Sequence, residues 1–384
     1  MSTEHGSSSR RGLFAAAIAA GIVAFVALVV VATSSAVARV ALAADDHRAL
    51  EPVWTHFMHD GPWGMATDRA GIVVTTDMDD VQSLDRGGHL RWSAHLESIV
   101  KGAPAIDDTH VIVGGRGLVT AVARHDGNRR WSQPMDADVT SVAIAGGLVL
   151  VGDHAGTLAA FDAETGVLRW SVHYEGRLWS AARVDPATGT VVATWHWSAT
   201  PAVRAFELAT GALRWQAPTE GFTAAPVIEH GLVVVAVGDG KRNARVEARD
   251  LVTGERRWDA GVPGSFEEAI EPVADAHDVA VVDHLGVATL LDLATGTVRW
   301  QHDFECPLLE SRVALTDRRV VFKSFSGDIF VLSRATGRLV SQQSPQRLGG
   351  YPIAAEATSW RGHPRLLVAL RLGAPYRVEL LPLP

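Results

Sequence analysis

The chain has 384 residues, a formal net charge of −8 and a hydrophobic fraction of 47%. An acidic chain of this kind lacks the basic surface that nucleic-acid binding requires, so we expect no nucleic-acid partner. Cys306 is the single cysteine, which excludes an internal disulfide. We expect Cys306 to be a buried apolar residue within a strand.

The N-terminal part differs in composition from the rest. Residues 1–11 contain Arg10 and Arg11, and residues 12–38 contain no charged side chain. An apolar run of this length is typical of a membrane-spanning helix, and the preceding arginines predict a cytoplasmic N-terminus. We therefore expect a transmembrane anchor or signal segment over 12–38 and a linker over 39–50. Cleavage near Ala38 or Ala43, giving a secreted protein, is the alternative.

A ten-residue phrase recurs through the remaining residues, 51–384. Residues 161–170 read FDAETGVLRW, and close copies occupy 206–215 and 291–300. Looser copies end at Trp92, Trp131 and Trp258, and one copy ends at Ser341 without a tryptophan. Each copy predicts two strands joined by a tight turn, because glycine accepts positive φ. The residues that we assign to this repeated structure are Trp54, Trp92, Trp131, Trp170, Trp215, Trp258, Trp300, Gly166, Gly211, Gly254, Gly296 and Gly337.

The spacing of the phrase predicts the architecture. Successive tryptophans from Trp92 to Trp300 lie 39, 39, 45, 43 and 42 residues apart. Two further β-rich runs precede each phrase, so each unit has about four short strands. Units of this size and content are typical of β-propeller blades. The sequence therefore predicts an all-β fold after the N-terminal helix.

Incomplete units at the two ends predict how the ring closes. Trp54 resembles the end of a phrase that lacks its beginning, and the last unit stops after residues 376–380 without a final strand. We expect the strand at Trp54 to complete the C-terminal blade, which protects the edge strands. This gives eight four-stranded blades. Seven blades is the alternative, if the last unit packs outside the ring.

The repeated phrase resembles that of the PQQ-like β-propeller family, over roughly residues 53–381. In size and layout the chain is most similar to the outer-membrane-assembly propellers of the BamB type. That resemblance implies a protein-binding scaffold in the cell envelope, with other envelope proteins or peptides as partners. Proteins of this type are lipoproteins, whereas no cysteine follows the apolar segment here to accept a lipid.

An enzymatic alternative also follows from the resemblance, because quinone-dependent dehydrogenases use this propeller. Such enzymes need a calcium cage of carboxylate and amide oxygens, and the family usually has an adjacent cysteine pair. Here there is one cysteine, and the ring contains only Asn128 and Asn243 as asparagines. We therefore predict a non-enzymatic protein with no catalytic residue, cofactor or metal. An extracytoplasmic sensor or ligand-binding module is a second alternative.

Two groups of polar residues suggest metal binding at first sight. Residues 77–80 read DMDD, but this segment falls where other units place a hairpin turn. His154 and His284 occupy equivalent positions in two different units, which lie far apart around a ring. We expect both groups to be turn residues.

Residues outside the phrase are the candidates for partner binding. Trp63 and Trp179 lie near the starts of their units, and strand alternation predicts Trp195 and Trp197 on one face of a strand. Tryptophan anchors dominate many interfaces, although packing between blades explains such residues equally well. Glu267 and Glu268 begin another innermost strand, either as a docking patch or as solvated charge. We expect a monomeric ring held outside the cytoplasm, in the periplasm or at the cell surface, by the N-terminal helix.

Overall fold

The computed structural model divides the chain into two units, Met1–Arg48 and Ala49–Pro384. It describes residues 51–98, 102–178, 181–195, 197–238, 244–263, 271–283, 285–304, 313–324, 326–348, 351–360, 363–371 and 376–383. The predictions for residues 1–50, and those for Trp179, Glu267, Glu268, His284 and Cys306, lie outside these ranges. Within them, no helix is long and apolar enough to cross a membrane.

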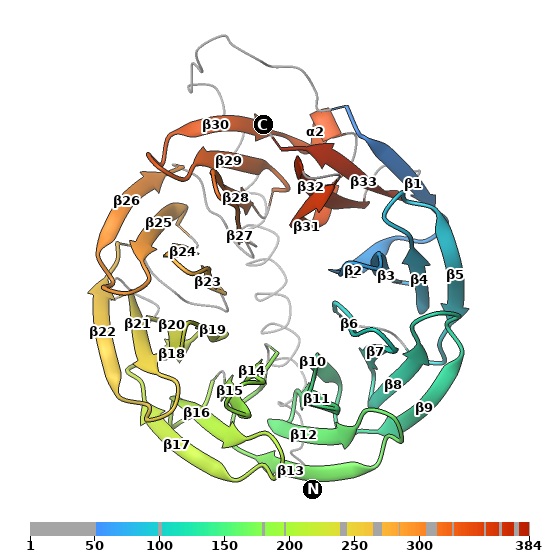
Figure 1. The fold of residues 1–384 in the computed structure, drawn as a ribbon, viewed down its shortest axis with the longest axis horizontal. Helices are drawn as coiled ribbons and strands as arrows, with labels where there is room; N and C mark the ends of the chain where they lie inside the picture. The colour runs from blue at the N-terminus through green and yellow to red at the C-terminus, as the bar shows by residue number, and fades with distance from the viewer. Residues whose placement is uncertain are drawn as a thin grey trace, which may run out of the picture. The chain divides into compact units, whose positions relative to one another are not determined.

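The second unit is an eight-bladed β-propeller, as predicted. Eight antiparallel sheets follow one another around a central axis, with the first strand of each blade innermost and the last at the rim (Figure 1). Seven of the sheets have four strands. The sheet of the fifth blade has five, because two short strands, β18 (Phe222–Thr223) and β19 (Val227–Glu229), both pair with β20 (Leu232–Gly238) at its innermost position. The alternative of seven blades is wrong.

The strand bounds of the first four blades are as follows. Blade 1 contains β2 (Pro62–Thr67), β3 (Ile72–Thr76), β4 (Asp80–Leu84) and β5 (Leu90–His95). Blade 2 contains β6 (Ala105–Ile106), β7 (His110–Gly115), β8 (Leu118–Ala123) and β9 (Arg129–Pro134). Blade 3 contains β10 (Val139–Ala145), β11 (Leu148–Asp153), β12 (Thr157–Asp162) and β13 (Leu168–His173). Blade 4 contains β14 (Arg183–Asp185), β15 (Thr190–Thr194), β16 (Ala202–Glu207) and β17 (Leu213–Pro218).

The other four blades continue around the ring. Blade 5 contains β18 (Phe222–Thr223), β19 (Val227–Glu229), β20 (Leu232–Gly238), β21 (Arg245–Asp250) and β22 (Arg256–Gly261). Blade 6 contains β23 (Val273–Ala274), β24 (Asp278–Val282), β25 (Val287–Asp292) and β26 (Val298–Asp303). Blade 7 contains β27 (Val313–Leu315), β28 (Arg319–Lys323), β29 (Ile329–Ser333) and β30 (Leu339–Gln343), followed by the one-turn helix α2 (Pro345–Leu348). Blade 8 contains β31 (Tyr351–Trp360), β32 (His363–Arg371), β33 (Tyr376–Pro382) and β1 (Trp54–Met58).

The ring closes through β1, which confirms the prediction from the incomplete end units. β1 pairs antiparallel with β33, in a register that sets Trp54 opposite Leu380 and Met58 opposite Tyr376. The Val53 amide extends this ladder by donating to the Leu380 carbonyl at 2.7 Å. The first strand after the N-terminal unit therefore supplies the outer strand of the last blade, and hydrogen bonds join the two ends of the propeller.

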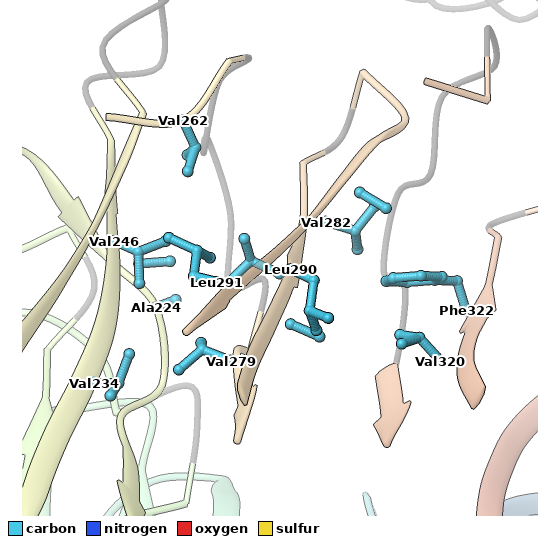
Figure 2. Packing of buried hydrophobic residues seen from close by; sticks show 14 of the residues in the cluster. Ala224, Val234, Val246, Val262, Val279, Val282, Leu290, Leu291, Val320 and Phe322 are labelled. Carbon is cyan, nitrogen blue, oxygen red and sulfur yellow. The ribbon is translucent and has the colours of Figure 1, made fainter. Parts of the chain in front are cut away.

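The hydrophobic core lies between neighbouring blades. In Figure 2, Val246 of blade 5 faces Leu291 of blade 6, and Leu290 on the other face of that strand points toward Phe322 of blade 7. All four of these side chains are fully buried. Alternate residues of each middle strand thus pack against the blade before and the blade after. Burying one such side chain contributes about 1.5–3 kcal/mol, so each blade depends on both of its neighbours.

The tryptophan of each repeated phrase joins one blade to the next by a packing contact and a hydrogen bond, which together we call the tryptophan lock. Its ring covers the turn glycine of the following blade, as Trp131 covers Gly166, which has φ of +69°. A Cβ atom on Gly166 would lie 2.7 Å from that ring, so glycine is needed for the close approach as well as for the turn. The indole N–H donates to a carbonyl of the following blade at 2.7–3.0 Å in Trp92, Trp131, Trp170, Trp215, Trp258 and Trp300.

Trp54 makes a less complete contact at the closure. Its ring covers Gly88 of blade 1 in the same way, with a Cβ distance of 2.5 Å. Its buried Nε1, however, has no hydrogen-bond partner in the described part of the chain. The junction between blades 8 and 1 therefore has the tryptophan–glycine packing of the other junctions, without an indole hydrogen bond to a described residue.

Candidate functional site

The antiparallel order of the strands gives the propeller two different faces. The turn face carries the hairpins that join the first to the second strand and the third to the fourth strand of a blade. The loop face carries the connections between blades and the turns between the second and third strands. The repeated phrase belongs to the turn face, whereas Trp63 and Trp197 belong to the loop face.

Trp63 is part of a closed group on the loop face. Its side chain is 43% exposed, and the Arg371 guanidinium lies 5.1 Å from the centre of its ring. Arg371 Nη2 in turn donates to Asp77 Oδ2 at 2.7 Å, and Asp77 Oδ1 accepts the Gly61 amide at 3.1 Å. Blades 1 and 8 are thus linked by an arginine that lies on a tryptophan and pairs with a carboxylate of the same protein.

Trp197 lies on the same face in blade 4, three blade positions along the ring from Trp63, and has a different neighbourhood. It is 52% exposed and has φ of +54°, a conformation that is costly for a large side chain. The exposed Arg177 guanidinium lies 4.9 Å from the centre of its ring. Within the described residues Arg177 pairs with no carboxylate. The arginine on Trp197 therefore differs from Arg371 on Trp63, which pairs with Asp77.

The structure places Trp195 away from Trp197, and the predicted alternation is wrong. Strand β15 ends at Thr194, and the chain then turns, so the two rings do not share a strand face. Trp195 is 1% exposed and donates its indole N–H to the Gly156 carbonyl at 2.9 Å. Its ring packs edge-on against Tyr174 at 5.0 Å between centres. Trp195 fills the junction of blades 3 and 4 and does not belong to an exposed contact surface.

Arg204 is a buried residue of this junction that sequence reasoning did not find. It is 2% exposed, and its guanidinium lies 4.3 Å from the ring centre of Tyr174 and 5.2 Å from that of Trp195. Its Nε donates to Gln216 Oε1 at 3.0 Å. Burial lowers the pKa of Arg204, and the nearby Tyr174 opposes that effect. The cation therefore lies against two aromatic rings, and among the described residues it pairs with no carboxylate.

The acidic segments singled out in the sequence are described at two places. Glu271, at the described end of the acidic stretch, pairs with Arg183 of blade 4 at 3.1 Å. Asp77 and Asp79 form a turn between β3 and β4, with φ of +66° at Asp79, which confirms the turn prediction. Across the described ranges, no group of three or more His, Cys, Asp or Glu side chains is placed to hold a metal ion.

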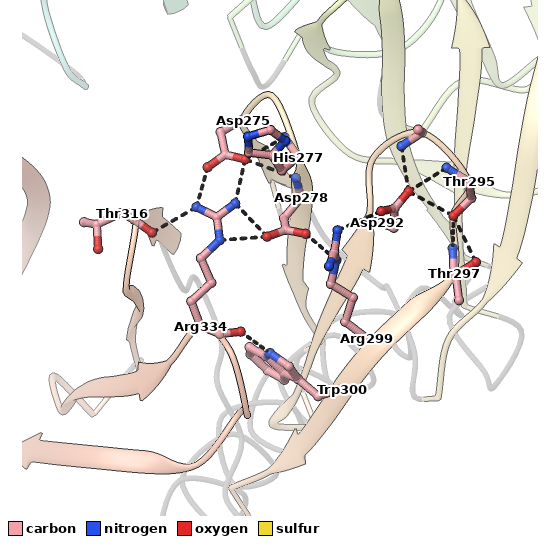
Figure 3. Close-up of polar contacts among 11 residues, drawn as sticks. Asp275, His277, Asp278, Asp292, Thr295, Thr297, Arg299, Trp300, Thr316 and Arg334 are labelled. Atoms are coloured by element: carbon pink, nitrogen blue, oxygen red, sulfur yellow. Dashed lines mark hydrogen bonds and ion pairs between the residues drawn. The ribbon is translucent and has the colours of Figure 1, made fainter.

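The turn face carries a charged network between blades 6 and 7 (Figure 3). Arg334 Nη1 and Nη2 bind the two carboxylate oxygens of Asp275 at 2.6 and 2.8 Å, and its Nε binds Asp278 at 2.7 Å. Arg299 lies between Asp278 and Asp292, at 2.6 and 2.7 Å. Burial alone would raise the pKa of Asp275, but the hydrogen bonds from Arg334 and two amides outweigh it and lower that pKa.

A pocket of about 410 Å³ opens beside this network. It is lined by Asp278, Arg299, Asp317, Arg318, Arg319, Ser333, Arg334 and Ala335. Sequence reasoning missed it, although the aligned phrases hold a signal. Ser333 and Arg334 stand where the phrase of blade 6 has Asp292 and Leu293. The copy that borders the pocket thus departs from the copies of blades 3, 5 and 6 at two adjacent positions, as the copy of blade 2 also does at Ala123 and Arg124.

Eight sheets closed by an N-terminal strand and joined by the repeated tryptophan lock define the class of this protein as a PQQ-like β-propeller. The sequence model of the family described as outer membrane protein assembly factor BamB matches residues 38–194 and 199–350. These residues are most of the chain, and the chain therefore belongs to that family.

Relatives and solved structures agree with this assignment. The outer membrane protein assembly factor BamB of Yersinia pestis is 24% identical over 351 residues, which are 86% of this chain and 84% of that protein. The crystal structure of BamB from Moraxella catarrhalis has a TM-score of 0.69 at 18% identity, over 87% of this chain and 98% of that one. A quinohemoprotein alcohol dehydrogenase from Comamonas testosteroni has a TM-score of 0.65 at 14% identity, over 87% and 76%. At these identities, the two structural matches show the shared fold alone.

Proposed function

We propose that this chain is a non-enzymatic scaffold that binds other proteins during outer-membrane or cell-envelope protein assembly. The relatives support the process, since each is named as an outer membrane protein assembly factor. The proposal places the propeller outside the cytoplasm as a monomeric ring. Residues 12–38 tether it to a membrane in this proposal, or release it after cleavage near Ala38 or Ala43.

The observation that carries the proposal is the exposed pair of Trp197 and Arg177 on the loop face. Exposed tryptophan and arginine are the residue types that most often dominate protein interfaces. Trp197 holds a conformation that costs free energy, and such strain persists where function requires it. Trp63 marks a second contact point on the same face. In this proposal Trp179, Glu267 and Glu268, which lie outside the described residues, contribute further contacts. Trp195 is left out because it is buried.

Photo-crosslinking in intact cells tests this proposal. A photoreactive amino acid replaces Trp197 in one variant and Trp63 in a second. A third carries it at Val252, which is 64% exposed in a hairpin of the turn face and serves as the matched control. We expect the loop-face positions to capture a defined set of envelope proteins and Val252 to capture none of them. Equal capture from all three positions would contradict the proposed face.

A further inference from the structure

The pocket between blades 6 and 7 lies on the turn face, away from the proposed partner-binding face. Its walls come from the first hairpin of each of the two blades, from β26 of blade 6 and from the second hairpin of blade 7. Its volume of about 410 Å³ falls within the roughly 300–1,000 Å³ typical of small-ligand pockets. The chemistry of its lining is best understood by comparison with the same hairpin in other blades.

In three other blades, a carboxylate organises this second hairpin. One oxygen of Asp162, Asp250 and Asp292 accepts the amide of the threonine three residues later, at 2.9, 2.9 and 3.0 Å. The other oxygen pairs with the arginine seven residues later, at 2.6, 2.6 and 2.7 Å. Side chains of both the turn and the outer strand thus converge on one carboxylate.

Blade 7 has no carboxylate at this position. Ser333 replaces the aspartate, and Val340 replaces the arginine seven residues later. The Thr336 amide donates instead to the Ser333 carbonyl, at 3.3 Å. Within the described residues, neither the Ala335 amide nor the Ser333 hydroxyl donates to a protein acceptor. Both residues line the pocket.

The arginines of the lining differ in how fully they are engaged. Arg334 directs its three nitrogens to Asp275, to Asp278 and to the Thr316 carbonyl. Arg299 uses Nε and Nη2 in its ion pairs, which leaves Nη1. Arg318 is exposed and forms no ion pair in the described part of the chain. Asp317, also exposed on the rim, is the acidic neighbour of Arg318 and limits the net positive charge that an approaching ligand meets.

We propose that this pocket binds a carboxylate, which takes the position of the hairpin carboxylate that blade 7 lacks. The Ala335 amide and the Ser333 hydroxyl donate to one carboxylate oxygen, and the Arg318 guanidinium pairs with the other. A planar two-oxygen group suits guanidinium geometry, and hydrogen bonds between ionised partners are about twice as strong as neutral ones. The carboxylate belongs to a small organic acid or to the C-terminus of a peptide.

Titration calorimetry on the purified propeller tests the proposal with citrate, with a short peptide that has a free C-terminus, with its amidated form and with inorganic phosphate. Ser333→Asp supplies a carboxylate from the protein itself, and we expect it to abolish binding while the protein stays folded. Arg318→Ala removes the ion pair, and we expect affinity to fall at least about tenfold. Arg69→Ala, an exposed arginine in the first hairpin of blade 1, is the matched control and should bind as the wild type does.

The outcomes separate the sources of the carboxylate and separate this proposal from the proposed function. Binding of citrate supports a small-acid ligand, whereas binding of the free peptide and not of its amidated form supports a chain terminus. Binding of phosphate alone, binding of none of the probes, or unchanged binding by Ser333→Asp would overturn the proposal. Trp197→Ala should leave carboxylate binding unchanged, because Trp197 lies on the other face.

Discussion

The two faces of the propeller use the same residue types in opposite ways. On the turn face, tryptophan rings cover glycines, indole N–H groups reach carbonyls and arginines reach aspartates, as Trp170, Gly211, Arg169 and Asp162 illustrate. On the loop face, Trp197 is exposed, and Arg177 lies on its ring and pairs with no carboxylate among the described residues. The comparison teaches that repeated residues serve stability, whereas residues that depart from the repeat are the ones that we propose to bind other molecules.

Removing one tryptophan from each face tests this comparison with the largest expected effect. Trp170→Ala removes a buried ring and a hydrogen bond between blades, and should lower the unfolding free energy by about 3–5 kcal/mol. Trp197→Ala removes an exposed ring, and should change that free energy by less than about 0.5 kcal/mol. Urea unfolding monitored by circular dichroism measures both. If Trp197→Ala lowered the unfolding free energy as much as Trp170→Ala does, the proposed difference between the two faces would be wrong.

Two glycines separate the tryptophan contact from backbone strain. In Gly211→Ala, the new Cβ meets the Trp170 ring at 2.7 Å, and φ is +71°. In Gly231→Ala, φ is +75° and no atom lies within 4 Å of the new Cβ. We expect Gly231→Ala to lower the free energy of unfolding by about 1 kcal/mol, from backbone strain alone. Gly211→Ala should lower it by about 1–3 kcal/mol more, because the Trp170 ring must move. Equal thermal unfolding temperatures for the two variants would contradict the role of the lock.

Acid should affect the turn face through its aspartates. A hydrogen bond from Arg169, together with bonds from Thr165, lowers the pKa of Asp162 from 3.8 to about 2. The ionised carboxylate therefore stabilises the folded state above pH 3.8, and this contribution is lost as the pH falls through about 2. Asp162→Asn should reduce the loss of stability between those two pH values. Asp136→Asn, an exposed aspartate without a partner in the described residues, should leave that loss unchanged.

The repeat made most of the fold predictable from the sequence. The positions of Trp54 and of the incomplete last unit indicated the pairing of β1 with β33, because a propeller must cover its edge strands. The site was less predictable. The prediction from strand alternation was wrong at Trp197, because the strand ends at Thr194. The positive φ of Trp197 could not be predicted, because no sequence pattern indicates it at a bulky residue.

The carboxylate pocket shows a different limit of the sequence. Aligned copies of the phrase reveal that Ser333 replaces an aspartate, so the missing carboxylate is visible without a structure. Its consequence is not visible, because Arg318 and Arg299 reach the same pocket from another hairpin and another blade. Proximity between blades depends on the closed ring, and no local pattern encodes it.

The central claim, that the loop face binds the partner, is tested most directly by capture yield in intact cells. The photoreactive residue stays at Trp63, and the chain additionally carries either Trp197→Ala or the turn-face change Val252→Ala. The proposed function predicts that Trp197→Ala lowers the yield of captured envelope proteins several-fold at an unchanged protein level, while Val252→Ala leaves it unchanged. Equal yields from the two variants would contradict the claim.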